Sequence, residues 1–403
     1  MNCQICKHNL IEILDLGKHP LCDDLKKVND HTKNKLYKII ILYCKNCFTA
    51  FQKYNVNKKI LFPKTYHYRS KFTEDVISGM KNLVQECKKK VGNLNNKIIL
   101  DIGSNDGSLL DLFKKEGSTT IGIEPTDAAK DANKKDHFLI NDYFSEQNVK
   151  VLLKKYKKID IITFTNVFAH IDNIKLLIKN LKKLIKKDTI LVIENHYLGS
   201  VLKKKQFDTF YHEHPRTYSL KSFIYIAKLL DMTVDDYSLP KRYGGNIRVY
   251  LKKNSKEKQK KFSILKKEKK FQSEFLKIQK FIIFWKNRKS KILKNAFIKY
   301  GLLSAKAFPG RAAILIKILG LDEKIIKTIY EKPKSKKIGF YAPGTKILVK
   351  SDNELFKNIK KLKVIINFAW HIEKEIEIYL RKNGFKGKLI NILDKKDLLW
   401  KIK

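Results

Sequence analysis

Four short apolar segments, separated by lysine-rich stretches, constrain the fold of this 403-residue chain more than any other feature. They span residues 97–101, 119–124, 160–165 and 189–194. Each is rich in β-branched residues and has the length of a buried strand, and the stretches between them are long enough for helices. Strands and helices that alternate in this way indicate a parallel sheet with helices on both faces. We therefore predict an α/β fold for residues 63–253.

The rest of the C-terminal half divides into two parts. Residues 254–300 contain 16 basic and three acidic residues, with apolar residues at helical spacing. This pattern predicts a basic helical linker of one or two amphipathic helices. From residue 301 the strand and helix pattern returns, and residues 363–369 have the composition of a buried strand. We therefore predict a second, smaller α/β domain over residues 301–403.

Two Cys-x2-Cys pairs precede the α/β core. Cys3 and Cys6 form the first pair, and Cys44 and Cys47 form the second. Two residues between the thiolates let both sulfurs of a pair face one ion, and two such turns complete a tetrahedral zinc site. A closed four-thiolate site is structural, because it folds a module that lacks a core of its own. We predict a zinc-binding module over residues 1–62, with two redox or incidental pairs as the alternative.

A loop with two glycines follows the first of the four strands. Residues 101–108 lead into a helix that begins near Leu109, so they lie at the carboxyl edge of the sheet, where ligands bind in this class of fold. Gly103 and Gly107 allow the backbone to approach a ligand, and the helix N-terminus offers N–H groups to a carboxylate. Glu124 ends the second strand, where an acid can accept both hydroxyls of a ribose. The third glycine of the dinucleotide fingerprint is absent, which favours S-adenosylmethionine (SAM) over NAD.

The chain is strongly basic, with a formal net charge of +46, but only seven of its 86 basic residues are Arg. Nucleic-acid-binding surfaces favour the forked guanidinium, so an excess of Lys spread along the chain indicates solvated faces instead. No apolar stretch follows a basic head at the N-terminus, and the longest charge-free apolar run near the middle has 11 residues. Six cysteines are too few for a disulfide scaffold. We expect a cytoplasmic protein with no membrane span, and we do not expect nucleic acid as a partner.

Several motifs follow the cysteine pairs in a characteristic order. They occupy residues 101–107, 122–125, 166–170, 207–214, 244–248, 341–345 and 368–371. In this order they resemble the zinc-containing sugar C-methyltransferases, which act on nucleotide-linked keto-deoxysugars. The resemblance covers nearly the whole chain. It implies a class I (Rossmann-like) methyltransferase core that uses SAM, an N-terminal zinc module and a C-terminal Rossmann-like domain. The implied partner is a small nucleotide-sugar substrate, and we expect a monomer or a homodimer.

The resemblance also implies catalytic residues. Methylation of a carbon next to a ketone needs a base for the C–H proton, donors for the enolate oxygen and alignment with the methyl donor. Residues 211–214 supply two imidazoles, a phenol and a carboxylate. The resemblance implies His214 as the base, Tyr211 as a ligand of the sugar oxygen and Glu213 as the residue that orients the imidazole or bonds the sugar. It places His170 near the reacting centre.

Other residues are expected to bind the cofactor and the substrate. Tyr66 and Tyr68 resemble an aromatic segment that covers the active site. Arg248 is expected either to contact the nucleotide diphosphate or to form a structural salt bridge. The expected cofactor-binding residues are Asp101, Gly103, Ser104, Asn105, Gly107, Glu124, Pro125 and Asn166, the last facing the amino-acid end of SAM.

The C-terminal domain departs from the pattern of the family. Its loop over residues 304–311 contains one glycine, Gly310, where the family has a glycine-rich turn. We therefore expect no dinucleotide there, and we expect Lys306 or Arg311 to lie near phosphate.

Two other functions stay open. The same cofactor could serve O- or N-methylation of a sugar or a sugar precursor, for which the base would be less essential. The zinc module and residues 254–300 could instead form a basic clamp on nucleic acid, but the shortage of Arg and the cluster at 211–214 argue against a clamp.

Overall fold

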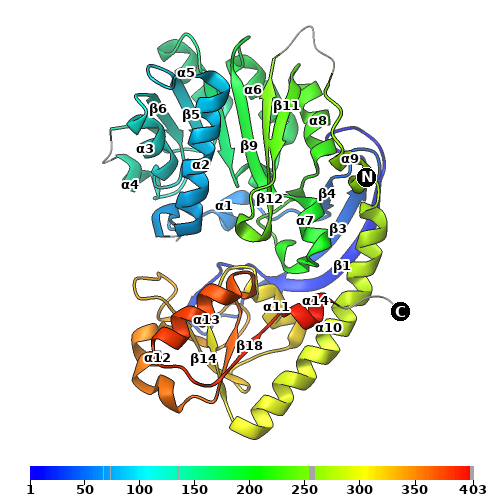
Figure 1. Ribbon diagram of the computed structural model, residues 1–403, viewed down its shortest axis with the longest axis vertical. Helices are drawn as coiled ribbons and strands as arrows, with labels where there is room; N and C mark the ends of the chain where they lie inside the picture. The colour runs from blue at the N-terminus through cyan, green and yellow to red at the C-terminus, as the bar shows by residue number, and fades with distance from the viewer. Residues whose placement is uncertain (67, 73, 134–135, 254–258, 400–403) are drawn as a thin grey trace. The chain divides into compact units, whose positions relative to one another are not determined.

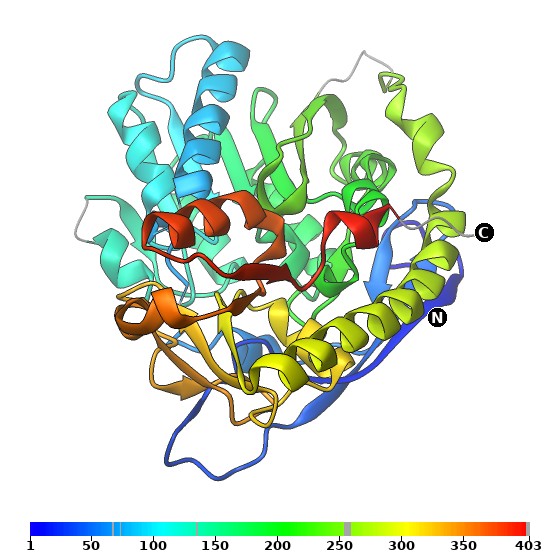
Figure 2. The ribbon, with the colours of Figure 1, turned by 60° about the horizontal axis from the view of Figure 1, so that its bottom comes forward.

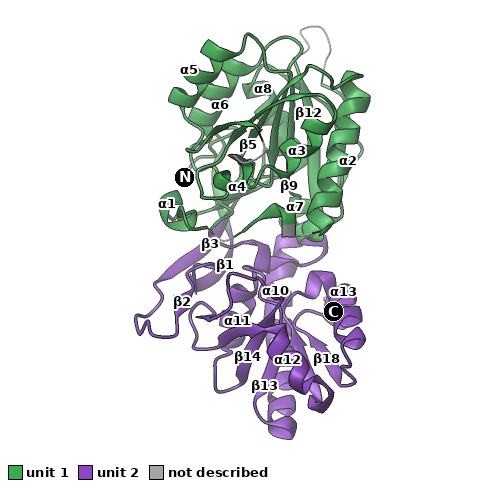
Figure 3. Cartoon of the chain, turned by 90° about the vertical axis from the view of Figure 1, so that its left-hand side faces the viewer, with its two compact units in different colours: residues 1–12, 42–201, 213–272 green, residues 13–41, 202–212, 273–403 purple. Residues whose placement is uncertain are grey.

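The fold is described from a computed structural model, which describes residues 1–66, 68–72, 74–133, 136–253 and 259–399 (Figure 1). The chain forms two compact units, and the sequence of each is interrupted (Figure 3). Unit 1 comprises residues 1–12, 42–201 and 213–272, and unit 2 comprises residues 13–41, 202–212 and 273–403. Residues 13–41 and 202–212, which were predicted as parts of the zinc module and of the methyltransferase core, lie in unit 2. Segments distant in the sequence can pack into one unit, so a division along the sequence does not reproduce it.

A seven-stranded sheet forms the centre of unit 1, in the order β11-β12-β9-β8-β5-β6-β7. The strands from β9 to β7 are parallel, and β12 runs antiparallel to both of its neighbours. The bounds are β5 (Ile98–Ile102), β6 (Thr119–Ile123), β7 (Phe138–Ile140), β8 (Ile161–Thr165), β9 (Ile190–His196), β11 (Thr233–Ser238) and β12 (Asn246–Lys252). All four predicted strands are confirmed to within two residues, and the α/β fold with a parallel sheet is confirmed with them.

Amphipathic helices cover this sheet. The first, α2 (Glu74–Val91), buries Val76, Met80, Leu83 and Cys87 at helical spacing, and these side chains share a core with residues of the sheet and of α3. The other helices of unit 1 are α1 (Lys58–Leu61), α3 (Ser108–Lys115), α4 (Ala129–Asn133), α5 (Glu146–Lys155), α6 (Ile174–Leu184), α8 (Leu220–Leu229) and α9 (Ile264–Glu268), and α7 (Leu198–Lys203) crosses the boundary at residue 201. Helix α3 begins one residue before the predicted position, directly after the glycine loop.

The N-terminal segment contributes to a four-stranded sheet in the order β1-β3-β4-β10. Its strands are β1 (Leu10–Pro20), β3 (Leu36–Cys44), β4 (Ala50–Gln52) and β10 (Arg216–Thr217). The chain leaves unit 1 within β1 and returns to it within β3. In unit 1, β10 pairs antiparallel with β4, so the segment after Glu213 is hydrogen-bonded to the zinc module.

Unit 2 contains a second seven-stranded sheet, in the order β18-β17-β13-β14-β16-β15-β2. The five strands from β18 to β16 are parallel. The bounds are β2 (Lys26–Lys27), β13 (Leu303–Lys306), β14 (Ile326–Glu331), β15 (Phe340–Tyr341), β16 (Leu348–Ser351), β17 (Val364–Asn367) and β18 (Lys388–Asn391). The helices after α10 are α11 (Ala312–Leu319), α12 (Asp352–Asn358), α13 (Glu373–Lys382) and α14 (Lys395–Leu398). The predicted second α/β fold and its strand at 363–369 are confirmed.

The predicted basic helices are α9 and α10 (Phe271–Tyr300). Helix α10 is the long yellow-green helix in Figures 1 and 2. Residues 254–258 lie outside the described residues. Within unit 2, Trp285 Nε1 of α10 donates a hydrogen bond to the carbonyl of Ile392 at 2.8 Å, and the buried Lys289 pairs with Asp394 at 2.9 Å. Most of α10 is therefore part of unit 2 rather than a separate linker, because its apolar face packs into that core. None of the described helices is long and apolar enough to cross a membrane.

Two buried ion pairs lie at the carboxyl edge of the second sheet. Both Arg311 Nε and Nη2 donate to the Asp208 carboxylate, at 2.8 and 2.6 Å, and Trp370 Nε1 donates to it at 2.8 Å. Lys306 Nζ lies 2.9 Å from the Asp352 carboxylate. The expectation that Lys306 or Arg311 lies near phosphate is wrong for this arrangement, because each cation is buried against its own carboxylate.

Candidate active site

The four predicted metal ligands come together in unit 1. The sulfur atoms of Cys3, Cys6, Cys44 and Cys47 all lie within 4.8 Å of one another. Four Zn–S bonds of about 2.3 Å in a tetrahedron would separate the sulfurs by roughly 3.8 Å. The Cys3–Cys47 and Cys6–Cys44 sulfur pairs lie at 3.5 and 3.3 Å, so the cage has the size that zinc requires.

Both cysteine pairs are built on the same backbone turn. Lys7 follows the first pair with φ of 67°, and its N–H donates to the Cys3 carbonyl at 3.0 Å. Phe48 follows the second pair with φ of 56°, and its N–H donates to the Cys44 carbonyl at 2.9 Å. A left-handed residue other than glycine is unfavourable by about 1–2 kcal/mol. Two matched turns of this kind fit two knuckles around one ion better than redox or incidental pairs.

The glycine loop leaves no room for side chains at its two glycines. Gly103 has φ of +77°, and a Cβ there would lie 2.3 Å from Val167 Cγ2. Gly107 has φ of +74°, and a Cβ there would lie 2.8 Å from the Cβ of Ala132. The Ser104 hydroxyl between them is buried, and no described residue forms a hydrogen bond with it. A tight loop with an unpaired buried donor is what a ligand with polar groups would fill.

The acids of the loop region lie at the ends of β5 and β6. The Glu124 carboxylate accepts hydrogen bonds from the backbone N–H groups of Asn105 at 3.0 Å and Thr126 at 2.9 Å, and burial raises its pKa. Pro125 follows it and is half-buried. Asp101 is buried and accepts a hydrogen bond from Thr163 Oγ1 at 2.7 Å, and burial raises its pKa to about 7. Each carboxylate keeps lone pairs for a ligand hydroxyl.

The aromatic segment that contains Tyr66 and Tyr68 is fastened to this loop. Asn105 Oδ1 accepts the N–H of Ser70 at 2.9 Å, and its Nδ2 donates to the Tyr68 carbonyl at 3.2 Å. Asp106 Oδ2 accepts the N–H of Lys71 at 2.9 Å. The side chain of Asn105, which was expected to bind the cofactor, thus joins the aromatic segment to the glycine loop.

Histidines and aromatic rings cluster at the carboxyl edge of the first sheet. The rings of His170 and His214 stack with centroids 5.1 Å apart, and His196 lies against His214 at 4.9 Å. His170 Nδ1 donates to the Glu213 carbonyl at 2.5 Å, which leaves Nε2 as the acceptor nitrogen. Burial lowers the pKa of His170, so its ring is neutral near pH 7. Tyr66 Oη lies 3.4 Å from the Glu213 carboxylate.

The structure thus brings together His170, Glu213, His214, Tyr66 and the glycine loop within unit 1. Tyr211 belongs to the segment 202–212 of unit 2, where it is half-buried. Asn166 directly follows β8 with φ of 56°, and its N–H donates to the carbonyl of Glu194 at 2.7 Å.

Arg248 is buried in a salt bridge, which was one of its two predicted states. Its Nε donates to Glu194 at 2.7 Å, its Nη1 lies 3.0 Å from Glu86, and its Nη2 donates to the Gly79 carbonyl at 3.1 Å. All three guanidinium nitrogens have protein acceptors and the side chain is fully buried, so the alternative contact with a diphosphate is not available here.

Sequence reasoning missed two rings of the cluster. His196 ends β9, at the same sheet edge as His170, and that position alone could have identified it. Tyr243 lies between β11 and β12, and its hydroxyl lies 2.8 Å from the hydroxyl of Tyr68. Its ring packs edge-on against His196 at 5.8 Å. Nothing in the sequence indicated that Tyr243 joins the cluster.

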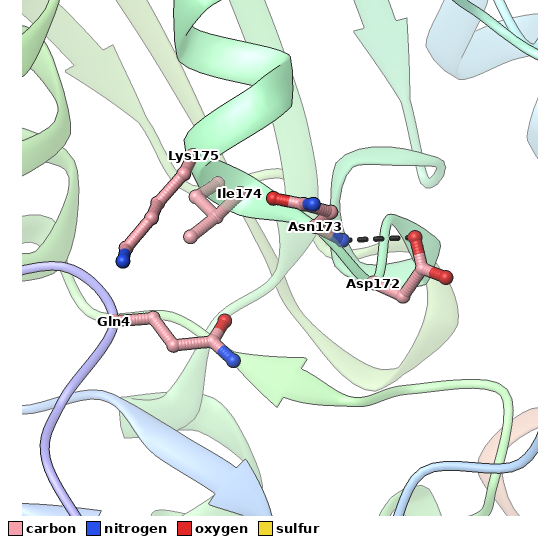
Figure 4. Close-up of a pocket in the computed structure, with 5 residues that line it drawn as sticks. All are labelled: Gln4, Asp172, Asn173, Ile174 and Lys175. Carbon is pink, nitrogen blue, oxygen red and sulfur yellow. Dashed lines mark hydrogen bonds between the residues drawn. The ribbon is translucent and has the colours of Figure 1, made fainter.

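A pocket of about 390 Å³ lies at the start of α6, and its lining residues include none of the predicted site residues (Figure 4). They are Gln4, Asp172, Asn173, Ile174 and Lys175.

Three family models match successive parts of the chain. One described as "Putative zinc binding domain" matches residues 3–62, one described as "Methyltransferase domain" matches residues 72–235, and one described as "C-methyltransferase C-terminal domain" matches residues 241–392. Together they follow the order of the predicted modules.

The chain is also similar to curated methyltransferases. The chain is 26% identical to the C-methyltransferase NovU of Streptomyces niveus over 251 residues, which cover 62% of this chain and 60% of that protein. It is 28% identical to the ubiquinone biosynthesis O-methyltransferase of Coxiella burnetii (strain RSA 493 / Nine Mile phase I) over 95 residues, or 23% of this chain and 41% of that protein. The chain therefore spans less than two thirds of the length of each of these two relatives.

Solved structures resemble part of the chain. The SAM-bound magnesium protoporphyrin IX methyltransferase of Synechocystis PCC 6803 aligns with 45% of this chain and 80% of its own, with 12% identity and a TM-score of 0.34. A SAM-dependent methyltransferase from Clostridium acetobutylicum ATCC 824 aligns with 44% of this chain and 91% of its own, with 13% identity and a TM-score of 0.35.

Proposed function

Because the chain belongs to the family of C-methyltransferases with an N-terminal zinc-binding domain, we propose that it transfers the methyl group of SAM to a carbon of a nucleotide-linked keto-deoxysugar. The observation that carries the proposal is the cluster of His170, Glu213 and His214 at the carboxyl edge of strands that also present the glycine loop. This edge is where a doubly wound sheet binds its ligands.

The cofactor site is formed by the glycine loop and its neighbours. SAM supplies, when bound, a methyl group on a positively charged sulfur. Gly103 and Gly107 leave room for backbone contact, and Glu124 has lone pairs left for ribose hydroxyls. The buried Ser104 hydroxyl and Asp101 are further polar contacts, and Asn166 is the residue proposed to face the amino-acid end.

His214 is the proposed base. It takes the proton from the carbon next to the ketone, and the electron pair left on the sugar is delocalised as an enolate. That pair then forms the bond to the methyl carbon, while the methyl–sulfur bond breaks with its electrons on sulfur. His170, fixed through its Nδ1 on the Glu213 carbonyl, holds the backbone next to His214. Tyr211 is the proposed ligand of the sugar oxygen.

Zinc has a structural part in this scheme. The sulfurs of Cys3, Cys6, Cys44 and Cys47 would hold the ion, and four thiolates would leave it no open position for substrate or water. Through the β4–β10 pairing, the zinc module supports the segment that begins directly after His214.

The test is proton exchange at the acceptor carbon. The protein is incubated in heavy water with a panel of nucleotide-linked 4-keto-deoxysugars and S-adenosylhomocysteine, and the sugar masses are recorded. A gain of about one dalton, followed by methylation when SAM replaces the homocysteine, is expected for one sugar. His214→Ala should abolish both reactions while SAM binding survives, and the exposed His31→Ala serves as the matched control.

Two results would contradict the proposal. Methyl transfer to a sugar without any exchange would move the reaction to an oxygen or nitrogen acceptor. Unchanged turnover in His214→Ala would exclude His214 as the base.

A further inference from the structure

Tyr243 adopts a backbone conformation that a large side chain rarely adopts. Its φ of 53° and ψ of 24° lie in the left-handed region, immediately before Gly244 and Gly245. For an aromatic residue this conformation is unfavourable by about 1–3 kcal/mol, and such residues gather at functional sites. Asn, Asp or Gly would satisfy the turn with less strain. We therefore attribute the presence of a tyrosine at position 243 to the place its side chain occupies, and not to the needs of the turn.

A buried ion network holds this strained turn in place. The Nε of Arg242, the residue before Tyr243, donates to the Glu194 carboxylate at 2.5 Å, and its Nη1 donates to the Val76 carbonyl at 3.1 Å. The N–H of Gly245 closes the turn on the Arg242 carbonyl at 2.9 Å. Arg242 and Glu194 are both almost fully buried, so the turn is fixed from inside the sheet.

The hydroxyl of Tyr243 is paired with that of Tyr68. The two oxygens lie 2.8 Å apart, and one hydroxyl must donate to the other. The accepting hydroxyl keeps its own proton, and accepting the bond makes it a stronger donor toward a third group. Burial raises the pKa of both phenols, so both stay protonated near pH 7. A tyrosine pair of this kind is a neutral donor for an oxygen that becomes negative.

The pair belongs to the same cluster as the proposed base. His196 packs against His214 at 4.9 Å and against Tyr243 at 5.8 Å, so the rings form a continuous row from the imidazole of His214 to the two phenols. Of these two phenols, only Tyr68 was expected from the sequence, as part of an aromatic segment that covers the active site.

We propose that Tyr243 is a further catalytic residue, whose hydroxyl, paired with that of Tyr68, donates to the ketone oxygen of the acceptor as it becomes an enolate. His196 packs against the rings of both the donor and the base. The inference rests on the proposed function, and it adds the group that holds the enolate oxygen while His214 takes the proton.

The test uses the full-length, zinc-loaded protein and the sugar for which the wild type shows exchange. Tyr243→Phe removes one oxygen and keeps the ring against His196. Loss of a single oxyanion donor lowers kcat about 100-fold or more. We expect that loss in kcat and in the deuterium exchange rate, with the Kd of SAM changed less than twofold. Tyr68→Phe should lower both rates in the same direction by a smaller factor, because it removes the partner that polarises the Tyr243 hydroxyl, and the double variant should be little worse than Tyr243→Phe alone.

The matched control is Tyr237→Phe, which removes a phenol oxygen from β11 in the same unit and is expected to keep kcat within twofold. Tyr68→Phe changes a different segment, so it decides the question if Tyr243→Phe folds poorly. If the wild type exchanges and methylates a sugar but both phenylalanine variants retain at least a third of the exchange rate, this inference is overturned and the proposed function stands. If the wild type processes no sugar, the proposed function fails first.

Discussion

The buried Asp101 allows a direct test of how burial next to the glycine loop changes the pH dependence of stability. The side chain is 2% exposed at the end of β5, and burial, opposed by the hydrogen bond from Thr163, raises its pKa to about 7. An unfolded Asp titrates near 3.9. Between these values the folded protein holds a proton that the unfolded chain releases.

The sign of the pH dependence follows from this difference. The contribution of the protonated Asp101 to stability is fully present below about pH 3.9 and is lost as the pH rises through about 7. Three pKa units at about 1.4 kcal/mol each correspond to about 4 kcal/mol. Since domains are stable by about 5–15 kcal/mol, this one carboxyl has a large effect above pH 7.

Asp101→Asn removes the titration and keeps the shape and the acceptor for Thr163. We expect the variant and the wild type to have similar free energies of unfolding at pH 4. At pH 8.5 the variant should be more stable by about 4 kcal/mol. Urea unfolding of the full-length protein, repeated at several pH values between 4 and 8.5, measures the difference in the free energy of unfolding. The matched control is Asp188→Asn, which is 71% exposed and should change the free energy by less than about 0.5 kcal/mol.

The result that would refute the reasoning is a constant difference between Asp101→Asn and the wild type across the pH range. A variant that is less stable than the wild type at pH 8.5 would also refute it, because the charged form would then be favoured in the folded protein.

Two further predictions concern the metal and the second unit. Cys44→Ser should abolish binding of about one zinc per chain and lower the melting temperature, because four thiolates fold the module, and an unchanged melting temperature after metal loss would contradict a structural role. Arg311→Ala should cost about 3–5 kcal/mol in denaturant unfolding, because it leaves Asp208 buried without its cation, and Arg311→Lys should cost less. A loss below about 1 kcal/mol would mean that Asp208 finds another partner.

Local sequence signals were enough for the sheet of unit 1 and the metal ligands. The strand at 161–165 is a run of apolar and β-branched residues, and such a run is buried whatever surrounds it. The two cysteine pairs carry their geometry in their spacing, since a two-residue gap fixes the knuckle turn. The glycine loop could be located because it follows a strand and its two glycines adopt positive φ without strain.

Contacts between distant residues could not be read from the sequence. Arg311 lies 103 positions after Asp208, and no local pattern indicates that they pair or that Lys306 pairs with Asp352. One or the other of these cations was therefore expected near phosphate, which is a common partner of a cation at a sheet edge. For Arg248 the sequence left two states open, and only the position of Glu194 on the neighbouring strand distinguishes them.

Glu194 is the common partner of Arg242 and Arg248 in a buried ion network. Two guanidinium groups offset the desolvation that would raise the pKa of this carboxyl, and they keep it below its ordinary value. Well-packed apolar residues of similar volume are often at least as stable as a buried ion pair, so stability alone does not account for the network. The main-chain carbonyl of Glu194 accepts the N–H of Asn166, and its carboxylate holds Arg242 next to Tyr243. Asn166 and Tyr243 are both left-handed. The Glu194 carboxylate fixes the strained turn at the phenol pair, which an apolar side chain at this position could not do, while the main chain of the same residue holds Asn166.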